Sequence, residues 1–189
     1  VMVGGGQNAS YEIVGDLQYL VDDTYYYNWS VRANDSVGFG NWASDYRLNI
    51  QSYVAINLTR DYINFGSITI GTNDTTDDSP LPFLLKNIGN VFVNVSINAS
   101  DLWISAVNPT PYYQFKVYNY AGQAGAFNWA ASTTSFTSVP NRTIVPRIMS
   151  GFNYTDTRNT AEIDVNITVP PGEGAGVKSS IITFVASRT

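Results

Sequence analysis

The sequence predicts an all-β protein, an antiparallel β-sandwich preceded by a partial sheet. Nearly every segment with a hydrophobic period repeats every second residue, which is the spacing of a strand with one buried face. Clusters of Gly, Pro, Asn and Asp separate these short segments, as is typical of sandwiches and barrels. No window of a dozen residues shows the 3.6-residue period of an amphipathic helix.

The first part of the chain, residues 1–51, is expected to hold three strands. They cover residues 11–18, 24–33 and 44–50, where aromatic and apolar side chains alternate with polar ones. Asp22-Asp23 lies before the second strand, where Asp favours a turn. Residues 1–6 are either a frayed terminus or a donor strand for a neighbouring subunit. Their Gly4-Gly5-Gly6 run lacks a following helix and Lys, so it predicts no phosphate site.

The second part, residues 52–189, is expected to hold eight strands bounded by turns such as 71–74, 108–111 and 170–174. These strands cover residues 53–59, 62–70, 81–88, 90–98, 112–119, 127–137, 161–169 and 178–187. Residues 93–98 alternate strictly between apolar and polar side chains. Because successive side chains of a strand point to opposite faces, Asn94 and Asn98 are expected on one solvent-facing side, about 13 Å apart.

Composition excludes several classes of function. The 189 residues include no Cys and no His, which removes disulfides, thiol nucleophiles, the commonest general base and the commonest transition-metal ligand. With 10 Lys and Arg and a net charge of −5, the chain has no basic patch for nucleic acid or an anionic membrane surface. No apolar run approaches the length of a membrane span. Charged residues make up only 13%, so another group must contribute to solubility.

Asparagine usage predicts that the group which contributes to solubility is N-linked glycan. The chain has 19 Asn, and ten of them stand in Asn-x-Ser/Thr triplets in which x is not Pro, whereas the Ser and Thr content gives about 3 by chance. This triplet accepts N-linked glycan, which is confined to surfaces outside the cytosol. The acceptors are Asn8, Asn28, Asn34, Asn57, Asn73, Asn94, Asn98, Asn141, Asn153 and Asn166. They predict an extracellular glycoprotein, and the alternative is a set of polar strand faces rich in Asn, Ser and Thr.

One segment of the first part carries a recognisable pattern. Tyr27-x-Trp29-x-Val31-x-Ala33 is followed by a Gly-containing turn and by Trp42, close before Ser44. This pattern resembles the last third of a fibronectin type III domain. The resemblance implies that the alternating residues share one core face, while the first four strands of that family are missing.

The missing strands leave an aromatic face without cover. Tyr27, Trp29, Val31 and Trp42 are therefore candidate interface residues, because a bare apolar face with open strand edges favours pairing with another chain. The cover comes from upstream sequence, from the second part of the chain, or from a neighbouring subunit by strand addition.

The second part has a pattern of its own, in which a Phe-Gly-x-Ile segment, an Asn-x-Gly-Asn-Val turn, a Val-Pro-x-Gly turn and a closing Ile-Thr-Phe strand follow one another. The segments are 65–68, 87–91, 169–172 and 182–184. This order is similar to the Ig-like or jelly-roll sandwiches of archaeal and bacterial surface proteins, including TasA-like filament subunits. The resemblance implies a subunit that forms filaments with copies of itself.

Candidate chemistry is sparse, and each candidate has a structural alternative. Asp77-Asp78 could contribute to an oxygen-rich Ca²⁺ loop, but the spacing is not that of an EF-hand and a solvated turn is the alternative. Glu162 and Asp164 share a strand face and could form an acid/base pair, and a solvent-facing strand is the alternative. No catalytic, cofactor or metal residue is predicted, and no enzyme activity is expected.

Aromatic side chains allow three roles: sandwich core, subunit interface, or a platform on which sugar rings stack. The residues concerned are Tyr25, Tyr26, Tyr27, Tyr112, Tyr113, Phe115, Tyr118, Tyr120, Phe127 and Trp129. The sequence as a whole predicts a structural subunit of a glycosylated extracellular filament or surface lattice, assembled by strand complementation. The alternative is an adhesin or a carbohydrate-binding stalk domain of a larger surface protein.

Overall fold

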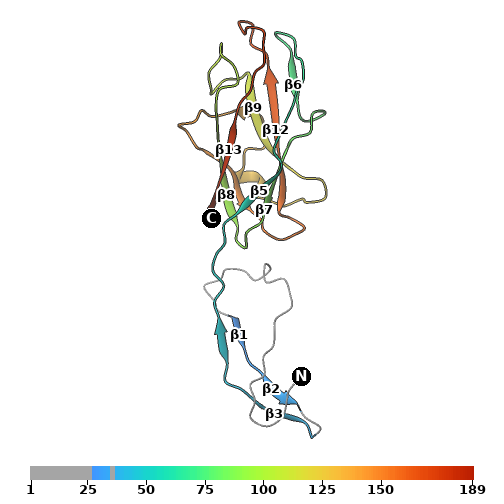
Figure 1. The fold of residues 1–189 in the computed structure, drawn as a ribbon, viewed down its shortest axis with the longest axis vertical. Coiled ribbons are helices and arrows are strands. Elements are labelled where there is room, and N and C mark those ends of the chain that lie inside the picture. The colour runs from blue at the N-terminus through green and yellow to red at the C-terminus, as the bar shows by residue number, and fades with distance from the viewer. Residues whose placement is uncertain (1–26, 35–36) are drawn as a thin grey trace. The chain divides into compact units, whose positions relative to one another are not determined.

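A computed structural model describes residues 27–34 and 37–189 of the chain, which divides into unit 1, ending at Ser52, and unit 2, Tyr53–Thr189 (Figure 1). The described residues form antiparallel sheets and no α-helix, so the all-β prediction is confirmed. None of their helices is long and apolar enough to cross a bilayer. Several predicted features lie outside the described residues: the donor segment 1–6, the strand 11–18, Asn8, Asp22-Asp23, Tyr25 and Tyr26.

Unit 1 contains two short ladders. Its strands are β1 (Tyr27–Trp29), β2 (Arg32–Asn34), β3 (Phe39–Trp42) and β4 (Tyr46–Leu48). β1 pairs with β4 and β2 pairs with β3, both antiparallel. Between the ladders, the Ala43 amide donates to the Val31 carbonyl at 2.8 Å. The single strand predicted over 24–33 is interrupted at Ser30 and Val31, and Trp42 ends β3.

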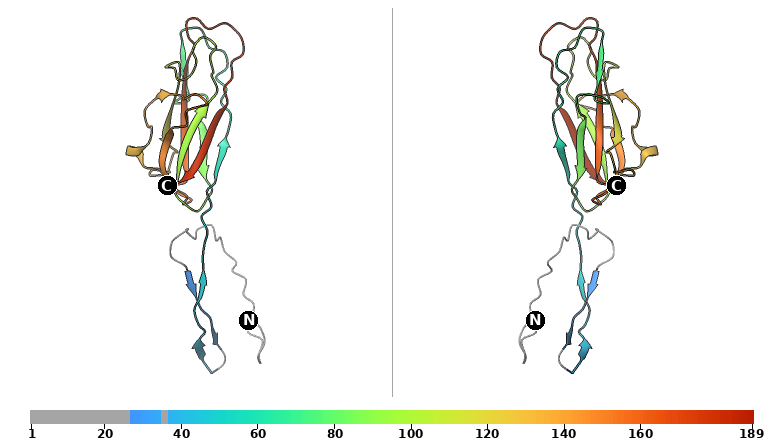
Figure 2. Two further views of the ribbon diagram at one scale, coloured as in Figure 1. Left: turned by 90° about the vertical axis from the view of Figure 1, so that its left-hand side faces the viewer. Right: turned by 90° about the vertical axis from the view of Figure 1, so that its right-hand side faces the viewer.

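Unit 2 holds nine strands and one 3₁₀ turn in its described structure. The elements are β5 (Ile56–Arg60), β6 (Asn73–Thr75), β7 (Phe83–Asn87), β8 (Val93–Ala99), β9 (Tyr113–Asn119), η2 (Trp129–Ala131), β10 (Thr137–Ser138), β11 (Arg147–Phe152), β12 (Thr160–Thr168) and β13 (Ile182–Arg188). The six-stranded sheet has the order β10-β9-β12-β7-β5, with β6 also paired to β12. The three-stranded sheet has the order β11-β8-β13, and Figure 2 shows β8 and β13 next to each other.

The core lies between these sheets and follows the predicted alternation. In β8, Val93, Val95 and Ile97 are fully buried while the residues between them are half-buried. β12 is the central strand of the larger sheet, and β9 pairs with it from Ala161 to Ile167. Burial of the apolar face supplies most of the stabilisation, at about 25 cal/mol per Å² of apolar surface.

Two predicted strands are wrong. Residues 62–70 enter no ladder, and Asn64 Oδ1 instead accepts a hydrogen bond from the Gly66 amide, where the backbone turns with a φ of +67°. Residues 127–137 begin with the 3₁₀ turn η2, because the Asn128 side chain caps it by accepting from the Ala131 amide. Only the end of that segment joins a sheet, as β10. The sequence also gave no indication of β3, β6 or β11 as strands.

A buried amide organises the turn between β7 and β8. Asn87 is 0% exposed, and its Nδ2 donates to the carbonyls of Val91 and Phe152, each at 3.0 Å. Its Oδ1 accepts from the Gly89 amide at 2.9 Å. Both N–H groups and the carbonyl oxygen of this side chain are therefore bonded inside the protein, and the bond to Phe152 ties the turn to β11 of the smaller sheet.

Both ends of unit 2 attach to the same turn. The Tyr53 amide donates to Asn90 Oδ1 at 2.7 Å, and the Asn90 amide donates back to the Tyr53 carbonyl at 3.1 Å. At the other end, the Thr189 amide donates to the Phe92 carbonyl at 3.3 Å. Residues 53 and 189 therefore lie near one another, at one end of the sandwich (Figure 1).

Candidate functional site

A groove of about 820 Å³ opens into unit 2. It is bordered by residues 61–70, which follow β5, and by residues 174–182, which lead into β13. Its floor consists of apolar core side chains, among them Phe83, Tyr113 and Ile167. The base of the groove is therefore apolar.

The rims of the groove are only partly engaged with the core. Ile63, Phe65 and Ile68 are half-buried and pack against core residues, although their segment belongs to no strand. On the opposite rim, Val177 is exposed. These apolar side chains are therefore only partly covered within unit 2.

Each sheet ends next to the groove. β5 is the last strand of the larger sheet and β13 is the last strand of the smaller one, and both are drawn along the same flank in Figure 2. In the described part of the chain, β5 pairs only with β7 and β13 pairs only with β8. Phe83 and Phe184 bridge the two sheets by an edge-to-face contact with centroids 6.0 Å apart.

A buried carboxylate holds the rim formed by residues 174–182. Glu173 Oε2 accepts hydrogen bonds from the Ile104 amide at 3.0 Å, the Ser105 amide at 2.9 Å and Ser105 Oγ at 2.7 Å. Its Oε1 forms an ion pair with Lys178. The Lys178 contact, followed by the Ser105 hydrogen bonds, lowers the pKa of Glu173 to about 2. These residues carry no sequence signal, because the contact joins segments 68 positions apart.

Acid is expected to release this contact. A carboxyl with a depressed pKa stabilises the fold above its ordinary pKa, 4.5 here, and loses that contribution as pH falls towards about 2. Glu173→Gln should therefore melt at a lower temperature than wild type at pH 7 and show a smaller decrease between pH 4.5 and 2. Thermal unfolding by circular dichroism across this range measures both effects.

The matched control is Glu162→Gln, because burial raises the pKa of Glu162 and gives the opposite sign. A carboxyl with a raised pKa contributes stability at low pH that is lost as pH rises, so this variant should not be destabilised at pH 7. Equal melting temperatures of wild type and Glu173→Gln at pH 7 would contradict the role of Glu173.

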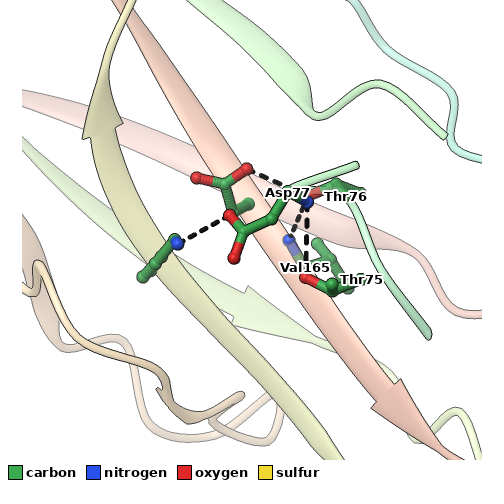
Figure 3. Close-up of polar contacts among 6 residues, drawn as sticks. Thr75, Thr76, Asp77 and Val165 are labelled. Carbon is green, nitrogen blue, oxygen red and sulfur yellow. Dashed lines mark hydrogen bonds and ion pairs between the residues drawn. The ribbon is translucent and has the colours of Figure 1, made fainter. Parts of the chain in front are cut away.

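Acidic residues also meet on the outer face of the larger sheet. Thr76 Oγ1 donates to Asp164 Oδ1 at 3.1 Å and accepts from the Val165 amide at 2.9 Å, while Lys116 Nζ contacts Asp77 Oδ1 at 2.6 Å. Figure 3 shows Thr76 and Asp77 over Val165 of β12, with these contacts as dashed lines. Glu162 joins the same face, where a pocket of about 230 Å³ lies.

This arrangement corrects the prediction of a solvent-facing strand. Asp164 is only 4% exposed, because residues 76 and 77 fold over it. Burial raises the pKa of Asp164, and the bond from Thr76 and the charge of Lys116 partly offset it. Burial, followed by the charge of Asp164, also raises the pKa of Glu162. Asp164 presents little surface to a substrate.

The Ca²⁺ alternative for Asp77-Asp78 gains no support. Across residues 27–34 and 37–189, no group of three acidic side chains is placed to hold a metal ion. Asp77 is instead paired with Lys116, whose ammonium also lies 4.6 Å from the centroid of the Phe136 ring.

The aromatic residues divide between the core and the surface. Tyr113, Phe115 and Phe127 are buried in the core. Tyr118 and Trp129 are exposed and contact each other edge to face, with centroids 5.4 Å apart. This exposed pair lies beside the acidic pocket, which Tyr118 also lines.

Of the predicted interface residues of unit 1, Tyr27, Trp29 and Trp42 lie in its ladders and Val31 lies between them. Val31 is 53% exposed and Trp42 is 62% exposed. The Arg32 guanidinium lies 3.7 Å from the Phe39 ring centroid and 4.6 Å from that of Trp42, a cation–π arrangement. Tyr27 and Trp29 are in β1, and the structure does not describe their side chains.

The predicted glycan acceptors differ in exposure. Asn34, Asn57 and Asn73 are exposed, whereas Asn94, Asn98, Asn141, Asn153 and Asn166 are half-buried. Asn28 is in β1, and its side chain is not described. The alternation in β8 places Asn94 and Asn98 on one face, as predicted. They are less exposed than predicted, because β11 and the turn before it contact both.

Comparison with known proteins gives no relative: no family model, curated protein or solved structure matches the chain.

Proposed function

We propose that this chain is a structural subunit of a glycosylated extracellular filament or surface lattice, in which strand complementation joins copies of the chain. The observation that carries the proposal is the apolar groove at the last strand of each sheet. A donated strand would bond to a rim through its backbone and place alternate side chains against Phe83 and Ile167 on the floor.

Unit 1 supports the same proposal from its own residues. Its ladders have two strands each, and isolated two-stranded ribbons are marginally stable in water. They also present exposed Val31 and Trp42. Contact with a neighbouring subunit would cover these side chains and stabilise the ladders.

The extracellular location is inferred from the ten glycan acceptors and the small number of charges. Glycans would be the covalent partners of the chain and would supply the solubility that 13% charged residues do not. The intact mass should then exceed the 20.7 kDa of the polypeptide.

A groove variant tests the assembly. Ile68→Asp should abolish filaments or oligomers, because a seated strand would bury an unpaired carboxylate at a cost of about 3 kcal/mol, roughly 100-fold in affinity. Ile68 is half-buried at the groove, so the β-type circular dichroism of the monomer should persist. Negative-stain electron microscopy and light scattering of the full chain measure both.

Val107→Asp is the matched control, because Val107 is an exposed apolar residue that does not line the groove. It should assemble as wild type does. Filaments from Ile68→Asp would contradict the groove as the assembly site.

A second candidate is the adhesin or carbohydrate-binding stalk, which the exposed Tyr118–Trp129 pair beside the acidic pocket favours. Aromatic faces and carboxylate acceptors are what neutral sugars require. A purely monomeric wild-type chain that binds oligosaccharide would support this candidate over the first.

A further inference from the structure

Two acceptor triplets form tight turns at the two ends of β11. Before the strand, Asn141 Oδ1 accepts from the Thr143 amide at 3.0 Å and from Thr143 Oγ1 at 2.7 Å. After it, Asn153 Oδ1 accepts from the Thr155 amide at 3.0 Å and from Thr155 Oγ1 at 3.1 Å. Each turn uses the carbonyl oxygen of the acceptor side chain and leaves its amide nitrogen, the atom that carries sugar, out of these bonds.

Two acceptors on the central strands use the amide nitrogen itself. Asn98 Nδ2 donates to the Arg142 carbonyl at 3.5 Å, and Asn166 Nδ2 donates to Gln114 Oε1 at 3.1 Å. Asn94 uses its Oδ1 as the turn acceptors do, accepting from the Gly151 amide at 3.2 Å, so what sets it apart is its place in the central strand β8. The segment that covers the two β8 acceptors therefore runs from the Asn141 turn through β11.

The strands themselves add a second difference. β8 is paired on one side with β11 and on the other with β13, and β12 is paired with β9 on one side and with β7 and β6 on the other. A central strand cannot bend into an enzyme cleft without breaking ladders on both of its edges. A surface turn is already bent and can enter without that loss.

We propose that sugar is attached to the folded subunit at Asn141 and Asn153, and that Asn94, Asn98 and Asn166 stay unmodified. This inference rests on the extracellular, glycosylated function proposed above. The donor would be a lipid-phosphate-linked sugar. The bond from sugar C1 to the phosphate oxygen breaks, the phosphate leaves with the electron pair, C1 bonds to Nδ2, and Nδ2 loses one proton.

The position of these turns fits the proposed assembly. In the sheet order β11-β8-β13, β11 ends the smaller sheet at the edge opposite β13. Residues 126–133 cover the outer edge of β11, because the Asn128 and Thr133 amides donate to the Ser150 and Ile148 carbonyls at 2.9 and 2.8 Å. Sugar at both ends of β11 would lie at this covered edge and leave the groove beside β13 clear. Glycosylation and assembly would then use opposite edges of one sheet.

Site-by-site occupancy tests the inference. The full chain is secreted from a host that performs N-glycosylation, and each acceptor is mapped by peptide mass spectrometry. Asn141 and Asn153 should exceed the three central-strand acceptors in occupancy by at least about tenfold, which corresponds to about 1.4 kcal/mol of local opening.

Paired variants identify the sites independently. Thr143→Ala and Thr155→Ala should each remove one glycan from the intact mass, and Thr143→Ser and Thr155→Ser should retain it. Thr168→Ala, which destroys the triplet of Asn166, should leave the glycan mass unchanged.

The outcomes separate this inference from the proposed function. The inference is overturned if Asn98 or Asn166 is occupied as fully as the two turn acceptors. It is also overturned if sugar is found on Asn57 or Asn73 but on neither turn. In both cases the proposal that the subunit is glycosylated is unaffected. A secreted chain with no sugar at any acceptor overturns both.

Discussion

Asn87→Ala is expected to lower the free energy of unfolding of unit 2 by about 3–5 kcal/mol, because it leaves several buried backbone groups without partners. The carbonyls of Val91 and Phe152 lose their donor, and the Gly89 amide loses its acceptor. Each such group retains its desolvation cost but no longer has a hydrogen bond to offset it. The turn between β7 and β8 should become more mobile in this variant.

Urea unfolding of the full chain followed by circular dichroism measures this effect as a lower midpoint. Asn64→Ala is the matched control, because Asn64 makes the same bond to an amide two residues later, also at 2.9 Å, but at the surface. Its loss should cost less than about 1 kcal/mol, since water replaces the missing partner. Similar urea midpoints for the two variants would show that burial of Asn87 does not determine the loss of stability.

Gly89→Ala is the other substitution with a large expected effect, about 3 kcal/mol or more. A Cβ at this position would lie 2.2 Å from the Tyr53 carbonyl oxygen and 3.1 Å from the Ala55 amide nitrogen. Both neighbours are backbone atoms, so no side-chain rotation relieves the clash. The segment 53–55 must move away, which breaks its hydrogen bonds to Ile88 and Asn90.

Hydrogen exchange at the Ile88 and Asn90 amides reports this movement, and the urea midpoint reports its cost. Gly174→Ala is the control, because nothing lies within 4 Å of its added Cβ. That variant should differ from wild type by less than about 0.5 kcal/mol. Protected Ile88 and Asn90 amides in Gly89→Ala would contradict the expected displacement.

Strands with a strict alternation were predictable from the sequence. β8, β9 and β12 each bury one face against the other sheet, and their residues show it locally. In residues 62–70, Ile63, Phe65 and Ile68 pack against the core, yet the segment forms no strand. The apolar pattern of this segment reflects its burial against the core. A strand also requires a neighbouring segment whose backbone groups are free to pair with it.

The strands that the sequence did not indicate depend on distant partners. β6 consists of Asn73, Asp74 and Thr75, which favour a turn, and it becomes a strand because β12 pairs with it. β11 contains Gly151 and two register irregularities against β8, so its alternation is disrupted. Both β6 and β11 are strands because they pair with segments that are far away in the chain.

The candidate sites also depend on contacts between distant segments, which the sequence does not reveal. Acceptor triplets are local and were found in full, but which of them are covered depends on contacts such as Asn98 with Arg142, 44 positions apart. Asp164 was expected in solvent because nothing in its own strand predicts that Thr76 covers it. The groove has no local pattern at all, since its rims come from segments about a hundred residues apart.

The anchoring of Tyr53 and Thr189 to one turn has a topological consequence. When the two ends of a domain lie together, a short peptide can join them and new ends can be opened in a distant loop, giving a circular permutant with the same sheets. The same closeness lets such a domain be spliced into a surface loop of another protein as a side branch, without stretching the host chain.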